Sequence, residues 1–271
     1  MNAVFISAVG LAAPGLDSWE RGQPTLRGAR PYETTDFAPQ MPRILPPNER
    51  RRATSLTRVA LQAAWDALTP SDPRLALPDA VGLRTVFASS HGDATVTGRI
   101  CRTLATKDRL ISPTDFHNSV HNAPAGYWTI GTHSQAASSS VSLLDGTFSA
   151  GFLEALTTAT TESAAVLLVA YDEPLPSPLG EAEHVTEPFA AALLLTPEEV
   201  PERAIRARVN LRGDAREDAM NDPGLENLRI GNPAARCLPL LRSLATAGNS
   251  SDGTSILPYL DDCRLEVTIS E

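Results

Sequence analysis

One stretch of the chain, residues 134–173, contains a strand, a tight turn, a helix and a second strand in close succession. Its first part, Ala136–Leu144, carries no charge and consists of small, β-branched and apolar residues, a pattern typical of a buried strand. The sequence Asp145-Gly146-Thr147 then interrupts the apolar run. We therefore expect a sharp elbow at this point, between a strand and the helix that follows it.

The second part of this stretch supplies the helix and the next strand. Phe148, Phe152 and Leu156 recur every four residues, which is the period of one helix face. Residues 164–170 (AAVLLVA) form a continuous apolar run, as expected for a strand that is covered on both faces. A strand–elbow–helix–strand unit favours an α/β fold with a parallel sheet, because parallel strands need a crossover connection.

The same hydrophobic patterns predict the remaining elements. Residues 19–47 contain six prolines and are expected to form an irregular surface excursion. Ser112 followed by Pro113 predicts a helix start, and Pro124 divides the following segment into two short helices. Further strands are expected at residues 4–9, 81–89, 187–196, 204–211 and 265–269, and helices at residues 48–68, 95–107 and 233–245, the last with a kink near Pro239.

The composition excludes several classes of function. A net charge of −9 argues against a general nucleic-acid binder, which needs a basic face. An acidic surface does not suit an acidic carrier protein either, unless a local basic patch exists. We expect no membrane span, because no apolar run is long enough to cross a bilayer. The 3 cysteines are widely spaced and make no disulfide framework, so a cytoplasmic location is expected.

Residues 111–173 resemble the central part of β-ketoacyl synthases, which have the thiolase-like fold. Residues 111–113 (ISP), Asn122, 125–126 (AG) and 129–130 (TI) match, in order, the family's segment before its nucleophile strand. The resemblance implies a thiolase-like, layered α/β/α fold, truncated in its second half. It implies one domain over residues 1–271, in which residues 1–196 resemble the N-terminal ketosynthase half and residues 197–271 form a reduced second half.

The family's catalytic groups are missing from this sequence. In those enzymes a cysteine on a strained elbow holds the acyl chain, and two histidines from the second half assist condensation. Here the elbow falls at or next to Asp145, and no cysteine occurs between Cys101 and Cys237. The last histidine is His184. We therefore expect no condensation by this chain alone, and no cofactor.

What the resemblance then implies is a chain-length factor of an aryl polyene or type II polyketide system. Such a subunit pairs with a full-length ketosynthase, shapes its acyl tunnel, and meets the acyl carrier protein through that partner. The candidates for the tunnel wall or interface are Phe116, His117, Val120, His121, Tyr127 and Trp128. The candidates for the strand that joins the two sheets are Ala136, Ser138, Ser140 and Ser142.

Three alternatives remain open at this stage. Ser149, or a serine near Ser139, is a possible nucleophile of an independent acyl hydrolase or transferase, although the G-x-S-x-G elbow is incomplete. His117, His121 and His133 are possible metal ligands, but the H-E-x-x-H pattern is not met, so no metal site is expected. The chain is also compatible with a structural homodimer that has no acyl tunnel.

Overall fold

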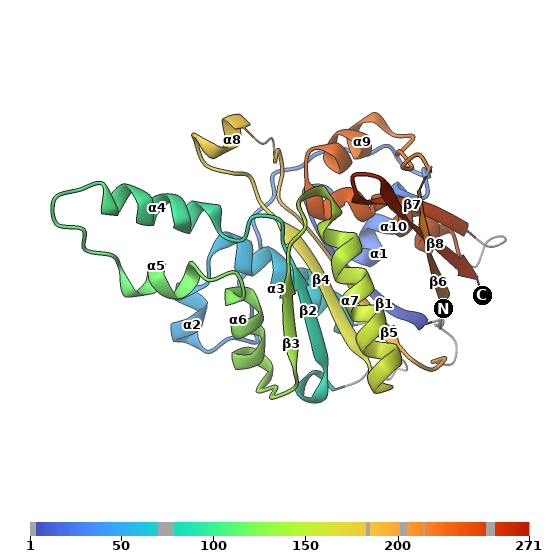
Figure 1. Cartoon of the computed structure of the whole chain (residues 1–271), viewed down its shortest axis with the longest axis horizontal. Helices are drawn as coiled ribbons and strands as arrows, with labels where there is room; N and C mark the ends of the chain where they lie inside the picture. The colour runs from blue at the N-terminus through green and yellow to red at the C-terminus, as the bar shows by residue number, and fades with distance from the viewer. Residues whose placement is uncertain are drawn as a thin grey trace.

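The structure, a computed structural model, describes residues 4–69, 79–182, 185–200, 205–213, 215–247 and 253–270. These residues form one eight-stranded mixed sheet with helices on both faces, which confirms the expected α/β class. Figure 1 shows the sheet in the middle of the molecule, with helix α7 (Thr147–Glu162) in front of it. In spatial order the strands are β3 (Ser138–Val141), β2 (Arg84–Ala88), β4 (Val166–Asp172), β5 (Phe189–Thr196), β1 (Val4–Ala12), β6 (Ile205–Arg212), β8 (Cys263–Ser270) and β7 (Gly253–Leu260).

Only the first part of the sheet is parallel. Strand β2 pairs in parallel with β3 on one side and with β4 on the other, as the strand–elbow–helix–strand unit predicts. From β4 onward every pairing is antiparallel. Strand β3 therefore lies at one edge of the sheet, and the hairpin of β7 and β8 lies at the other.

Each face of the sheet has its own hydrophobic core. On one face, α7 and the C-terminal helices pack against alternate residues of most strands, and the stacked rings of Phe148 and Phe152 lie 5.9 Å apart there. On the other face, α3 and α6 cover the strands from β2 to β1. The helices are α1 (Trp19–Leu26), α2 (Pro47–Arg52), α3 (Ser55–Leu68), α4 (Ala94–Leu104), α5 (Pro113–Asn118), α6 (Ala123–Thr132), α7, α8 (Leu179–Ala182), α9 (Pro223–Ile230) and α10 (Leu238–Thr246), with short 3₁₀ turns η1 (Ala80–Gly82), η2 (Leu144–Gly146) and η3 (Pro233–Cys237).

Helices α4 and α5 form an arm that extends away from the sheet, on the side of β3 (Figure 1). The two helices are joined by an ion pair, in which Arg99 Nη2 lies 2.7 Å from Asp115 Oδ1. At the base of the arm, the Asn118 side chain donates to the Arg52 carbonyl at 3.0 Å and so connects α5 to α2. The break that Pro124 predicts between two short helices is confirmed, since α5 ends at Asn118 and α6 begins at Ala123.

Two predictions for the first 70 residues were wrong in part. The expected excursion over residues 19–47 begins with helix α1, because Ser18 caps it by accepting from the Arg21 N–H. The expected helix over residues 48–68 is two helices. Thr54 adopts an extended conformation and caps α3 by accepting from the Thr57 N–H at 3.3 Å, and this interrupts the chain after α2.

The strand expected at Ala136–Leu144 is shorter and more exposed than predicted. Strand β3 covers Ser138–Val141, so Ala136 and Ser142 lie outside it, and its residues are exposed or half-buried. The reason is its position, because an edge strand pairs on one side only and lacks the cover that a central strand has. The expected second strand likewise begins later, at Arg84 rather than Val81.

In the last quarter of the chain, β6 and β8 confirm the predicted strands, whereas α9 and β7 were not predicted. Pro258 conceals β7 in the sequence, since proline is tolerated only on an edge strand, which is where β7 lies. The helix expected at residues 233–245 consists of η3 followed by α10, so the predicted kink is present close to Pro239.

The contact between β1 and α3 leads to a testable prediction. A Cβ added at Gly10 would lie 2.0 Å from the Ala63 carbonyl oxygen, which belongs to the backbone of helix α3 and cannot yield easily. We expect Gly10→Ala to lower the free energy of unfolding by about 3 kcal/mol, measured by urea denaturation. Gly126→Ala is the matched control, because that Cβ meets nothing within 4 Å and alanine favours a helix by about 1 kcal/mol. Equal stability of both variants would contradict this account of the packing.

Candidate functional site

The elbow between β3 and α7 lies where the sequence predicts it. Its turn, η2, contains Leu144, Asp145 and Gly146, and the strained backbone is at Leu144, with a φ of 44°. A non-glycine residue at positive φ is uncommon and is frequently found at functional sites. None of these residues is a cysteine, so the elbow offers no thiolate.

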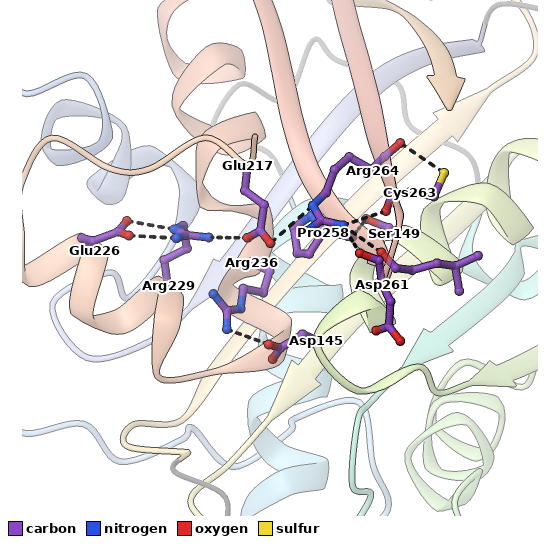
Figure 2. A network of polar contacts seen from close by, with 11 residues as sticks. Asp145, Ser149, Glu217, Glu226, Arg229, Arg236, Pro258, Asp261, Cys263 and Arg264 are labelled. Carbon is purple, nitrogen blue, oxygen red and sulfur yellow. Dashed lines mark hydrogen bonds and ion pairs between the residues drawn. The ribbon is translucent and has the colours of Figure 1, made fainter. Parts of the chain in front are cut away.

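Asp145 at the elbow is held by an ion pair. Its carboxylate lies 2.8 Å from Nη2 of Arg236, which belongs to η3 and is only 14% exposed. Arg236 therefore connects the elbow to the C-terminal part of the chain. Figure 2 shows this pair beside a second group of ion pairs, in which Arg229 contacts Glu226 and Glu217.

The C-terminal strand β7 closes over the start of α7. A Cβ at Gly146 would lie 2.2 Å from the Tyr259 carbonyl oxygen, so only glycine fits between the elbow and β7. One turn further along the helix, the Ser149 hydroxyl donates to the Pro258 carbonyl at 2.5 Å, as Figure 2 also shows. Ser149 is 1% exposed, so the hydroxyl is not accessible to a substrate. This geometry gives no support to Ser149 as a nucleophile.

A group of polar residues gathers beside the elbow, at the carboxyl ends of the parallel strands. Asp172, at the end of β4, is 2% exposed and accepts hydrogen bonds from the Ser89 hydroxyl and the Ser90 N–H, each at 2.9 Å. The Ser142 hydroxyl donates to the Ser90 carbonyl at 2.8 Å. His121 Nε2 lies 2.9 Å from the Ser89 carbonyl oxygen. These contacts fix the ends of β2, β3 and β4 relative to one another.

Burial changes the acidity of two carboxyl groups in this region. Desolvation raises the pKa of Asp172 to about 7, although the hydrogen bonds from Ser89 and Ser90 partly oppose this effect. Desolvation, and then repulsion by Asp93, raise the pKa of Glu173 to about 7. Burial also raises the pKa of the Cys237 thiol, which therefore remains protonated and unreactive near neutral pH.

The structure separates the predicted tunnel residues into two groups. On the arm and just after it, Phe116 is 66% exposed and Val120 is 48% exposed, and His117 is also exposed. His121 is half-buried through its contact with β2. Tyr127 and Trp128, by contrast, are fully buried in the core between α3, α6 and the sheet. They lie beneath the surface, and His117 stacks edge-on against Tyr127 at 5.6 Å.

The histidines considered as metal ligands have other roles. His121 contacts the Ser89 carbonyl, and His133 ends α6 in a left-handed conformation with a φ of 57°. Within the part of the chain that the structure describes, no group of three histidine, cysteine or acidic side chains is placed to hold a metal ion. No helix among the described residues is both long and apolar enough to span a bilayer.

Sequence reasoning missed two residues that organise the region around the elbow. Asn232, fully buried, donates to the Asp172 and Glu187 carbonyls at 3.2 and 2.8 Å and thereby connects β4 to η3. Arg236 holds Asp145. The Asn-Pro pair that begins η3 was a visible turn signal, but no sequence pattern indicates which distant backbone Asn232 contacts.

Comparison with known proteins identifies the family and the fold of this chain. The family model "Beta-ketoacyl synthase, N-terminal domain" matches residues 25–232, well over half of the chain. No curated protein matches. The fold is thiolase-like, as the similar solved structures indicate.

Three solved structures illustrate the similarity. The first is the ketosynthase ApeO in complex with its chain length factor ApeC from Xenorhabdus doucetiae, with a TM-score of 0.72 and 23% identity, covering 99% of this chain and 100% of that one. The second is the ishigamide ketosynthase/chain length factor, with a TM-score of 0.76, 13% identity and 99% coverage of both chains. The third is AntDE:AntF, a type II polyketide synthase carrier protein with its ketosynthase, with a TM-score of 0.72, 12% identity and 99% coverage of both chains.

The buried carboxyl group of Asp172 leads to a prediction about pH. Because its folded-state pKa is raised, the folded protein binds the proton more tightly than the unfolded chain, and stability is lost as pH rises from about 4 to about 7. Asp172→Asn removes this loss. We expect the unfolding free energy of the variant minus that of the parent to increase by about 1–3 kcal/mol from pH 5 to pH 8, measured by urea denaturation.

Ser89→Ala provides the opposite control, since the Ser89 hydroxyl stabilises the charged carboxylate. This variant should lose more stability at pH 8 than at pH 5. A stability difference between Asp172→Asn and the parent that stays constant over this range would contradict the assignment.

Proposed function

This chain belongs to the β-ketoacyl synthase family through its N-terminal domain, and from that premise we propose that it is a non-catalytic chain-length factor. In this proposal it pairs with a full-length, active β-ketoacyl-acyl carrier protein synthase and shapes the acyl tunnel of that enzyme. The product is an aryl polyene or another polyketide, made in the cytoplasm. The acyl carrier protein is bound by the catalytic partner rather than by this acidic chain.

The observation that carries the proposal is an elbow without a nucleophile beside an unpaired strand edge. Leu144, Asp145 and Gly146 occupy the elbow, and the nearby Cys237 and Ser149 are buried. Condensation needs an accessible thiolate. The family fold is therefore retained here without its chemistry, which favours a role in which the fold serves a partner.

The open edge of β3 supports pairing with another subunit. The Thr85 N–H donates to the Ala137 carbonyl and the Ser89 N–H to the Val141 carbonyl, so the odd-numbered residues of this segment bond inward to β2. In a parallel pair the alternate residues, Ser138 and Ser140, direct their N–H and C=O groups to the open side. An unpaired edge of this kind is a template for a strand from a second chain.

The arm supports the second part of the proposal, contact with the tunnel of the partner. It presents Phe116 to solvent together with Leu110, which is 80% exposed, and the exposed Val120 follows directly after it. Exposed apolar side chains gathered on one projection are typical of a protein interface. The buried Tyr127 and Trp128 would act indirectly, by supporting the position of His117 and the base of the arm.

Similar structures support the identity of the partner. The first two structures described above are named as ketosynthase/chain length factor pairs. In the proposal, the present chain takes the non-catalytic place in such a pair, since it lacks the cysteine that the catalytic subunit requires.

Proline substitutions in β3 test the strand-pairing model. Ser140→Pro removes an N–H that points to the open edge, so it should leave the pairing with β2 intact but block an added strand. We expect the partner ketosynthase recovered with a tagged chain to fall at least tenfold in coexpression. Ser139→Pro is the matched control, because it removes an inward bond and should lower the yield of folded chain itself. If Ser140→Pro leaves the amount of partner unchanged, the partner does not pair at this edge.

Alanine substitutions separate the two groups of aromatic residues. Phe116→Ala truncates an exposed side chain, so it should leave folding unchanged but alter the product length or rate of the reconstituted pair. Trp128→Ala empties a core position and should lower the unfolding free energy by about 3–5 kcal/mol. Product length is read by mass spectrometry of the released polyene. If Phe116→Ala and Val120→Ala, alone and together, change neither length nor rate, the arm does not contact the tunnel.

A further inference from the structure

Leu144 combines two unfavourable features in one residue. Its backbone has a φ of 44°, a conformation that leucine rarely adopts, and its apolar side chain is 64% exposed to water. Glycine or asparagine at this position would avoid both the backbone strain and the exposed apolar side chain. Strained backbone that persists in a folded protein is frequently found at functional sites, which makes Leu144 a candidate for one.

The turn around Leu144 is held in place by several contacts. The Gly146 N–H donates to the Leu143 carbonyl at 2.8 Å, and the Leu143 N–H donates to the Thr147 hydroxyl at 2.8 Å. That hydroxyl in turn donates to the Leu144 carbonyl at 2.6 Å. The ion pair of Asp145 with Arg236 attaches the next residue to η3. The elbow is thus a tightly bonded support that holds Leu144 outward.

A second exposed leucine lies beside the elbow. The close approach of Gly146 to the Tyr259 carbonyl places the end of β7 against η2, and the next residue, Leu260, is 46% exposed. Leu144 and Leu260 together form what we call the elbow patch. Exposed apolar side chains on a rigid turn are a surface that a protein partner can cover.

Leu144 follows the open edge strand closely in the chain. Strand β3 ends at Val141, so Leu144 lies three residues further along, at most about 10 Å away even if the chain were fully extended. Strand β3 has only four residues. A partner strand of the typical five or six residues that paired with it would therefore extend beyond its end. A subunit that adds a strand to β3 therefore brings its neighbouring surface close to Leu144.

We infer that Leu144 is an anchor residue of the interface with the ketosynthase-fold partner, whose surface covers the elbow patch with apolar side chains. This inference rests on the proposed function, since it takes the same partner and the same edge. It gives the elbow a new role. In a catalytic relative the elbow would hold the acyl chain. In this chain the elbow contacts the neighbouring subunit.

A substitution that relieves the strain provides a specific test. Asparagine tolerates the left-handed conformation, so Leu144→Asn should keep or raise the yield of folded chain while removing the apolar anchor. Leu211→Asn is the matched control, because Leu211 is 51% exposed on β6, at a distance of several strands from β3. Each tagged variant is coexpressed with a full-length ketosynthase from the same genome, and the recovered partner is measured per tagged chain.

We expect Leu144→Asn to recover at least tenfold less ketosynthase than the parent, and Leu211→Asn to recover the parental amount. Recovery of the parental amount with Leu144→Asn would overturn the inference and leave the proposed function standing. Failure of the parent chain itself to recover any ketosynthase would instead overturn the proposed function.

Two further outcomes are informative about Leu144 itself. If both Leu144→Asn and Leu144→Gly fail to fold, as judged by circular dichroism, the side chain is required by the single chain and the inference is wrong. If the parent chain forms a dimer with a second copy of itself and Leu144→Asn separates it, the elbow patch has a different occupant from the one inferred here.

Discussion

The close contact between Gly146 and the Tyr259 carbonyl is the constraint on which the rest of the site depends. No side chain fits between the elbow and β7, so the start of α7 is covered by the C-terminal hairpin rather than left open to a substrate. The hydrogen bond from Ser149 to Pro258 and the ion pair of Asp145 with Arg236 reinforce the same junction. The C-terminal part of the chain thereby holds the elbow in place.

Around this junction, the interior of the sheet and its exposed edge have different properties. Asp172 and Asn232 fix the carboxyl ends of the strands from within, and burial of Asp172 couples this arrangement to pH. On the outside remain the backbone groups of β3, the apolar side chains of the arm and Leu144. Fixed strand ends inside the sheet and exposed apolar side chains on its surface make this region suited to binding another protein.

The sequence was sufficient for the elements whose patterns are local. The apolar run of β4, the four-residue period of α7 and the Asp-Gly interruption predicted the central unit, and a short motif series indicated the family. Strand β3 lies within its predicted range but is shorter, and it was predicted to be buried because small uncharged residues look the same at an edge and in a core. Helix α3 was merged with α2, since a run of arginines favours helix and hides the cap at Thr54.

The remaining features of the site depend on contacts between distant parts of the chain, which no local pattern reveals. No local pattern signals the positive φ at Leu144, and Ser149 is buried against β7, the strand that Pro258 conceals in the sequence. Tyr127 and Trp128 were proposed for a tunnel wall because the resemblance places their segment there. Their position in the core depends on how α6 lies against α3 and the sheet.

The most direct test of the account is the mass of the complex formed when this chain, carrying the only tag, is coexpressed with a full-length ketosynthase from the same genome. The account predicts a one-to-one complex by light scattering after size-exclusion chromatography, with the lone chain poorly soluble because its edge and arm are uncovered. A soluble, self-sufficient chain that recovers no ketosynthase would contradict it.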